Sequence, residues 1–203
     1  MKYLPFSLSL VTGLALIWVL NTRWGNIPPM GPFMDPDEGF WAQAERQPFS
    51  NFTDQLPGVI DSVEVYFDDR RVPHVFAQND HDLYYMQGYL QARDRLFQME
   101  LQTYDAAGRL SELIGPSLVE RDRQSRRWGM VFGAEHALAE VRKHEPSWTI
   151  FKAYSAGVNA YINSLESEQY PLEYKLLDIA PEPWTPLKTA LLHKNMTNCK
   201  NCL

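Results

Sequence analysis

The sequence predicts a mostly helical α+β fold that begins with a single β-hairpin. Apolar residues recur at helical spacing from residue 80 onward, whereas strand-like alternation is confined to residues 63–77. The chain has 203 residues, 45% of them hydrophobic and 22% charged, so it is long enough to bury a core without disulfides. The net charge of −6 argues against a nucleic-acid partner, which would require a basic surface. The sequence contains no internal repeat, Gly-rich phosphate loop or Gly-x-Ser-x-Gly elbow.

The N-terminus predicts a targeting segment in residues 1–25. Lys2 precedes an uncharged, largely apolar run over residues 3–20, and Arg23 follows it. This order is typical of a secretory signal or a signal anchor. Because no Ala-x-Ala-like site follows Leu20, we favour an anchor that holds an exported protein to the membrane through residues 3–20. A cleaved signal peptide and a buried core helix are the alternatives.

Residues 26–61 are predicted to form a linker, because prolines and glycines interrupt them throughout. One short helix is expected at residues 37–45. Asp35, Asp37 and Glu38 offer the oxygen ligands that calcium prefers, but their spacing differs from that of an EF-hand loop. We therefore expect a solvated turn at these three residues.

The hairpin follows the linker. Residues 63–68 alternate between apolar and polar positions, residues 69–71 are expected to turn, and residues 72–77 form the returning strand. Pro73 cannot donate to a strand ladder, so it should lie at a sheet edge or be the first residue of its strand. His74 could act as a base, but a structural role beside the proline is favoured.

A long helix should begin near Asp80, with Asn79 or Asp80 as its N-cap, and end at Gly108. Its apolar positions form one continuous stripe, which consists of Leu83, Met86, Leu90, Phe97, Leu101 and Tyr104.

Asp94 falls within this stripe. A buried carboxylate costs roughly several kcal/mol unless it is paired, so a cationic partner is expected from another element. Arg126 and Arg127 are the candidates, since Arg95 points to a different face of the helix. Asp94 could instead be a catalytic acid or base, but the sequence supplies no second group for that chemistry.

Three further helices are expected. They cover residues 130–143, residues 148–165 with Ser147 as N-cap, and a last segment that starts near Leu187 after the Pro-rich link 180–186.

Residues 191–203 form a divergent tail that contains Cys199 and Cys202. A single Cys-x-x-Cys is half of a zinc site, and His193 could join it only if a helix end unravelled. A redox pair would be expected at the start of a helix. We favour an unstructured terminal sequence.

A series of short segments resembles one known family. They are the hairpin 68–77 with its Val-Pro-His pattern, the block 88–100, the loop 108–115, Asp122 with Arg126 and Arg127, the block 154–161, and Pro181-Glu182-Pro183-Trp184. Together, residues 62–190 resemble the N-terminal part of the penicillin acylase family of amidohydrolases. Arg71 departs from the pattern, because many relatives have Gly there. If the turn needs positive φ, Arg71 costs on the order of 1 kcal/mol.

The resemblance implies part of the α chain of an N-terminal-nucleophile hydrolase with an αββα fold. In that family a precursor splits into α and β chains, and the new N-terminal residue of β attacks an amide carbonyl. That nucleophile is expected beyond Leu203, so no residue here is nominated as catalytic. The resemblance places Met196 near the acyl pocket. No cofactor is expected in this fragment, because the ligands of the family's calcium would lie beyond it.

The favoured hypothesis is therefore a fragment of an exported amide hydrolase that is inactive without its β-chain portion. Typical substrates in the family are penicillins, cephalosporins and acyl-homoserine lactones. An alternative is a membrane-anchored, non-catalytic binding or scaffold protein derived from such an α chain. A third hypothesis is an α chain that assembles with a separately encoded β chain.

Overall fold

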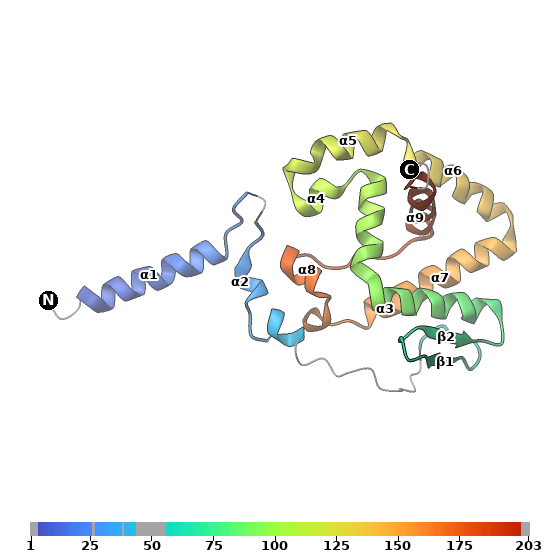
Figure 1. The fold of residues 1–203 in the computed structure, drawn as a ribbon, viewed down its shortest axis with the longest axis horizontal. Coiled ribbons are helices and arrows are strands. Elements are labelled where there is room, and N and C mark those ends of the chain that lie inside the picture. Colours follow the sequence, from blue (N-terminus) through green and yellow to red (C-terminus); the bar gives the residue numbers. More distant parts are fainter. Residues whose placement is uncertain (1–3, 26, 38, 44–55, 200–203) are drawn as a thin grey trace.

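The computed structural model describes residues 4–25, 27–37, 39–43 and 56–199. This part of the chain is mostly helical with a two-stranded antiparallel sheet, which confirms the predicted combination of helices and a hairpin (Figure 1). The helices are α1 (Leu4–Leu20), α2 (Met30–Phe33), α3 (Asp80–Ala107), α4 (Leu110–Ile114), α5 (Val119–Arg127), α6 (Met130–Lys143), α7 (Glu145–Asn163), α8 (Leu172–Leu177) and α9 (Pro186–Cys199). The strands are β1 (Glu64–Phe67) and β2 (Pro73–Phe76).

The centre of the fold is the crossing of α3 and α7. A Cβ atom at Gly88 of α3 would meet the carbonyl oxygen of Tyr154, and one at Gly157 of α7 would meet that of Tyr85. The two helices therefore approach through their backbones, which only glycine at both positions allows.

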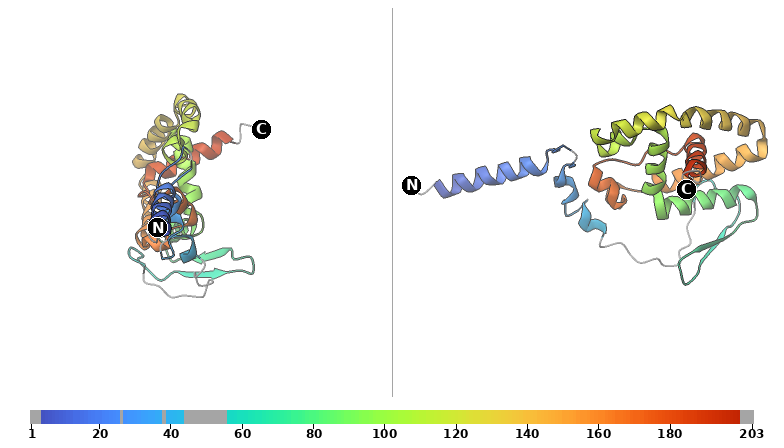
Figure 2. Two further views of the ribbon diagram at one scale, coloured as in Figure 1. Left: turned by 90° about the vertical axis from the view of Figure 1, so that its left-hand side faces the viewer. Right: turned by 45° about the horizontal axis from the view of Figure 1, so that its top comes forward.

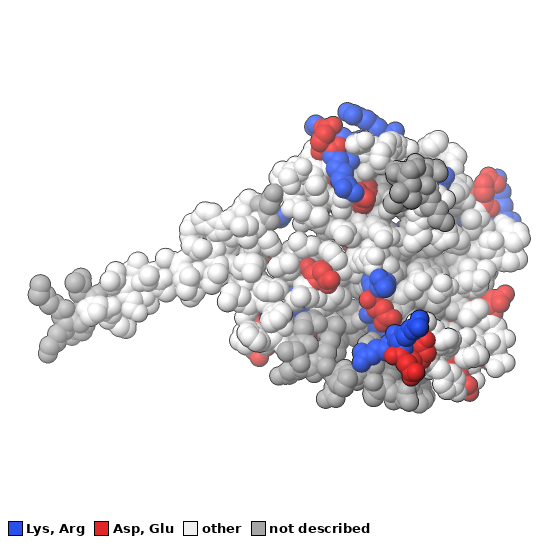
Figure 3. Space-filling view, viewed as in Figure 1, with Lys and Arg blue, Asp and Glu red and all other residues white. Residues whose placement is uncertain are grey.

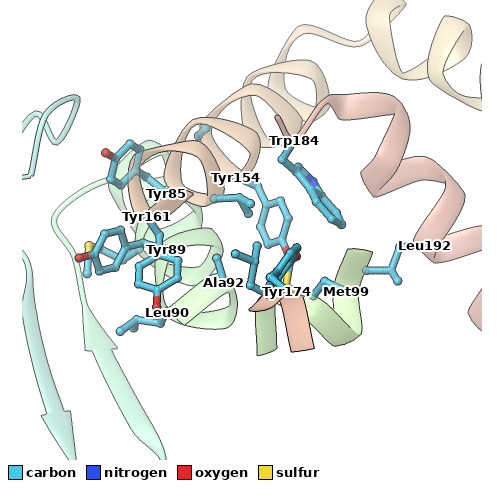
Figure 4. Packing of buried hydrophobic residues seen from close by; sticks show 14 residues of the cluster. Tyr85, Tyr89, Leu90, Ala92, Met99, Tyr154, Tyr161, Tyr174, Trp184 and Leu192 are labelled. Atoms are coloured by element: carbon cyan, nitrogen blue, oxygen red, sulfur yellow. The ribbon is translucent and has the colours of Figure 1, made fainter. Parts of the chain in front are cut away.

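Tyrosine side chains fill the core around this crossing (Figure 4). The rings of Tyr89 and Tyr161 meet edge to face, with their centroids 5.6 Å apart. The hydroxyl of Tyr154 donates to Gln91 Oε1 at 2.6 Å, and burial raises the pKa of Tyr154 to about 12. The hydroxyl of Tyr154 thus finds a partner while its ring is buried, as aromatic core residues require.

The ends of α3 agree with the sequence prediction. The Asn79 side chain accepts a hydrogen bond from the backbone N–H of Asp82 at 2.8 Å, so Asn79 is the N-cap. Gly108 closes the helix in the left-handed conformation, with φ of 66°. Within the helix, however, Arg95 has non-helical angles (φ −145°, ψ 27°), so α3 is kinked there.

The hairpin is also close to prediction. Pro73 is the first residue of β2 and pairs with Phe67, while Val65 pairs with Val75. The side chains of Val65, Phe67 and Val75 face the core, as the alternation predicted. Arg71 in the turn has φ of 61°, so the position that departs from the family pattern is strained.

Of the next two helices, only α7 differs from prediction at its ends. Helix α6 covers residues 130–143 as expected, but α7 starts at Glu145 rather than at Trp148. The cap is His144, whose Nδ1 accepts from the backbone N–H of Ser147 at 3.4 Å. The sequence interpretation missed this cap because Ser147 is the more common N-cap residue type.

The end of the chain corrects another expectation. Helix α9 starts at Pro186 and continues to Cys199, where an unstructured tail was expected. Leu191 and Leu192 are buried in it, so packing against the body of the protein extends this helix. Cys202 lies outside the described residues.

Helix α1 extends away from the other helices (Figures 1 and 2). It contains no charged residue, and the charged side chains visible on the rest of the molecule are of mixed sign (Figure 3). In the described ranges, no helix combines the length and apolarity that a membrane crossing requires.

The described part of the linker forms α2 and a 3₁₀ helix at Phe40–Gln43, which falls within the short helix expected at residues 37–45. Lys175 of α8 donates from Nζ to the carbonyl oxygen of Gly39 at 3.0 Å. This hydrogen bond holds the linker against the body.

Candidate functional site

A groove with a volume of about 730 Å³ lies between β2, α3 and α9. It brings together three residues that the sequence singled out for different reasons, namely Pro73, Asp94 and Met196. Its lining consists of Pro73, Val75, Leu83, Tyr84, Gln87, Leu90, Gln91, Asp94, Arg95, Gln98, Met99, Gln102, Leu192 and Met196. The lining combines apolar side chains with glutamine amides, which suits an occupant with apolar groups and an amide.

The prediction for Asp94 is wrong. Its side chain is 35% exposed and contacts Arg93, whose Nε lies 3.3 Å from Asp94 Oδ1. The prediction assumed an unbroken helix, but the kink at Arg95 interrupts the helical period and leaves Asp94 on the groove wall. Asp94 therefore faces solvent and needs no partner from α5.

Arg126 and Arg127 have other partners. Arg126 Nε donates to the carbonyl oxygen of Gly108 at 2.9 Å, and Arg127 lies on the surface 3.9 Å from Glu120. A Cβ at Gly108 would meet the backbone of Asp122 and the Arg126 side chain. Arg126 and Gly108 thus join the end of α3 to α5, a structural role.

Asp122 anchors the neighbouring helix. Its carboxylate accepts from the backbone N–H groups of Leu110 and Ser111, both at 2.8 Å, at the start of α4. Burial opposes ionisation, but these hydrogen bonds and Arg126 hold the pKa of Asp122 below its usual value. The negative charge of Asp122 also stabilises the N-terminus of α4, where the helix dipole is positive.

Among the residues that the structure describes, the ionisable side chains lining the groove are Tyr84, Asp94 and Arg95, and they form no nucleophile–base pair. His74 projects elsewhere, with its side chain 56% exposed and 3.8 Å from Asp68. Among the described residues, no three His, Cys, Asp or Glu side chains converge on a metal position.

An ionic network behind the groove was not predicted. Glu100 of α3 is 5% exposed, and its Oε1 lies 3.2 Å from Lys188 Nζ of α9. The same oxygen accepts from the backbone N–H of Glu182 at 2.9 Å, and Oε2 accepts from the Tyr174 hydroxyl. The network joins α3, α8, the Pro-rich link and α9.

Glu182 extends the network to the surface. Its carboxylate accepts from the Tyr104 hydroxyl at 2.7 Å and from Arg109 Nη2 at 3.0 Å, and Lys188 Nζ lies 3.0 Å away. Burial opposes ionisation, but the hydrogen bonds from Arg109, Tyr104 and Lys188 lower the pKa of Glu182 to about 2.

The sequence held one signal for this network. Glu100 lies four residues after Leu96 and four before Tyr104, so it is a carboxylate on an apolar helix face. This is the argument that the sequence interpretation applied to Asp94.

Comparison with known proteins agrees with this architecture. The family model for penicillin amidase matches residues 62–200. Penicillin acylase 2 proenzyme from Pseudomonas sp. (strain SE83) is 37% identical over 144 residues, which are 71% of this chain and 18% of that protein. Acyl-homoserine lactone acylase QuiP from Pseudomonas aeruginosa is 29% identical over 150 residues, or 73% of this chain and 17% of that protein.

A solved structure is also similar. Thermostable penicillin G acylase from Alcaligenes faecalis has a TM-score of 0.62 and 32% sequence identity, covering 71% of this chain and 76% of the solved chain. The present chain spans less than a fifth of the curated relatives cited, 18% and 17% of their lengths. Since the family model matches most of the chain, this protein belongs to the penicillin amidase family.

Proposed function

We propose that this chain is the N-terminal portion of an amidohydrolase of the penicillin acylase type, within an αββα fold. Its reaction would be hydrolysis of a linear amide C–N bond, such as the acyl bond of a penicillin or an acyl-homoserine lactone. The observation that carries the proposal is the 37% identity to penicillin acylase 2 proenzyme over 71% of this chain.

In this proposal the chain contributes a wall of the acyl site and no reacting group. Support comes from the groove, which has apolar and amide side chains but no nucleophile–base pair. Met196, 52% exposed at the groove edge, would contact the acyl group. The nucleophile and the oxyanion donors would come from a β-chain portion, either covalently linked or separately encoded, so the chain alone would be inactive.

The test is to produce the full chain with the part of penicillin acylase 2 proenzyme that follows the matched region. We expect the two to co-purify and to release the acyl acid from penicillin G or from an acyl-homoserine lactone, whereas the full chain alone releases none. The control is the full chain with Gly157→Leu, which disrupts the α3–α7 crossing. Hydrolysis by the chain alone would contradict the proposal that the nucleophile lies on the β-chain portion. Failure of the two to co-purify would contradict the proposal that this chain associates with such a portion.

The alternative is a non-catalytic binding protein that would hold its ligand against the apolar and amide side chains of the groove. It predicts that the full chain alone binds an acyl amide without cleaving it. Calorimetric titration of the full chain with penicillin G separates the two functions. Binding without a catalytic partner favours the binding protein, because the proposed hydrolase has only one wall of its site here.

We also propose that α1 directs the protein out of the cytoplasm and holds it at the membrane. In support, α1 has 17 residues without a charge, and its large apolar side chains are exposed. Cell fractionation of the full chain should find it with the membrane after an alkaline wash. The double variant Leu10→Arg/Leu14→Arg should appear in the soluble fraction, because charges in this helix oppose insertion.

A further inference from the structure

One face of α9 carries both an ion pair and part of the groove wall. Lys188, Leu192 and Met196 are spaced four residues apart, so they lie on one side of the helix. Lys188 Nζ lies 3.2 Å from Glu100 of α3, while Leu192 and Met196 line the groove with Met99 of α3. Figure 4 shows Leu192 beside Met99. The position of the pair along the two helices therefore determines which part of α9 faces Met99.

The carboxylate of Glu100 is held in place from two other directions. The backbone N–H of Glu182 donates to Oε1 at 2.9 Å, and the Tyr174 hydroxyl donates to Oε2. Glu100 belongs to α3, and these donors come from the Pro-rich link and from α8, so its carboxylate has partners outside α9.

Lys188 has little freedom as well. Its side chain is 12% exposed, and Nζ also lies 3.0 Å from Glu182 Oε2. A slide of α9 along α3 by one turn would carry the ammonium about 5.4 Å away from the Glu100 carboxylate. Breaking a buried pair in this way leaves an uncompensated charge, which is strongly unfavourable.

We propose that the Glu100–Lys188 pair is a positioning device that sets the register of α9 on α3 and so the shape of the groove. Lys188 is then a positioning residue for acyl selectivity, a consequence that rests on the proposed function. The pair itself does not touch the groove and acts through Leu192 and Met196.

Two methionines of α3 test the register without any ligand. Met99 and Met86 are both 7% exposed and belong to the same core cluster, but of the two only Met99 lines the groove with Leu192 and Met196 of α9. In the full chain with Lys188→Leu, treated with dilute hydrogen peroxide, we expect Met99 to be oxidised about fivefold faster relative to Met86. Peptide mass spectrometry gives both rates in one sample.

Two further variants complete this measurement. Lys188→Arg keeps the charge and should restore the protection of Met99. Glu100→Gln keeps a side chain of the same shape and should raise the Met99-to-Met86 ratio even if Lys188→Leu does not fold. An equal rise at both methionines would mean a general loss of stability and would overturn the inference, as would an unchanged ratio in Glu100→Gln.

A second readout uses the enzyme produced with the penicillin acylase 2 remainder. Lys188→Leu should change the ratio of kcat/KM for penicillin G and a long-chain acyl-homoserine lactone by about tenfold. The matched control is Thr189→Val, which removes the acceptor of the Trp184 Nε1–H bond in the same helix and should leave the ratio unchanged. An equal change in Thr189→Val would overturn the specificity role. Inactivity of the complex with the unsubstituted chain would instead reject the proposed function, and the methionine ratio would still decide the register.

Discussion

Gly157 of α7 lies against the backbone carbonyl of Tyr85 in α3, so closely that a Cβ atom at Gly157 would collide with that oxygen. The separation of the two central helices is therefore set by backbone contact. The tyrosine rings of the core pack around this contact, and the groove lies on another side of α3.

Substitution at this crossing should be destabilising even with the smallest side chain. We expect Gly157→Ala to lower the free energy of unfolding by about 1–3 kcal/mol, because a packed backbone cannot move aside. The control is Gly133→Ala in α6, where an added Cβ meets only the end of Lys194 at 3.4 Å. That variant should be neutral or stabilise by up to about 1 kcal/mol. Urea unfolding measures both, and equal effects would contradict the account of the crossing.

Two aspartates of α3 should respond differently to loss of charge. Asp82 is fully buried and accepts from the backbone N–H groups of Ile60 and Asp61 at 2.9 and 2.8 Å. Asp82→Asn should cost about 2 kcal/mol or more, because hydrogen bonds to a charged acceptor are lost.

Asp94→Asn is the matched variant for that measurement. Its carboxylate is 35% exposed and has one ion pair at 3.3 Å, so the change should stay below about 1 kcal/mol. Thermal or urea unfolding of both variants at pH 7 measures the two losses of stability. A loss at Asp94 as large as that at Asp82 would restore the buried role first predicted for Asp94.

The local elements could be predicted because each depends on residues close in sequence. Asn79 as a cap, Gly108 as a helix end and Pro73 at a strand start all follow from backbone chemistry at one position. The buried face of α3 could be predicted only in part, because periodicity assumes a straight helix. Leu83 is exposed, and the kink at Arg95 moves Asp94 out of the core.

The groove and the ionic network around Glu100 could not be predicted from residues close in sequence. Glu100 meets Lys188 and Glu182 only after α8, the Pro-rich link and α9 have packed onto α3. A carboxylate on an apolar helix face needs a partner. In α3 the buried carboxylate with such a partner is that of Glu100, which pairs with Lys188, and not that of Asp94.

The charge of Glu182 should make stability depend on pH in the acid range. Its pKa in the folded protein is about 2, below the ordinary value of 4.5, so folding favours the ionised form. This contribution is fully present above about pH 4.5 and is lost as the pH falls towards 2. Glu182→Gln should therefore be less stable than the unsubstituted chain at pH 7, and the difference should shrink between pH 4.5 and 2. Urea unfolding at several pH values tests this, and a difference that grows towards low pH would contradict it.

The turn of the hairpin offers a substitution that should stabilise the protein. Arg71 has φ of 61°, a conformation that costs a non-glycine residue about 1 kcal/mol or more. Arg71→Gly should raise the free energy of unfolding by up to about 1 kcal/mol, because glycine adopts positive φ without a steric penalty. Arg70→Gly, one residue earlier and without positive φ, should lower it, because glycine there only adds freedom to the unfolded chain. Opposite signs in thermal unfolding support the backbone explanation, whereas a loss of stability in both variants would assign the effect to the arginine side chains.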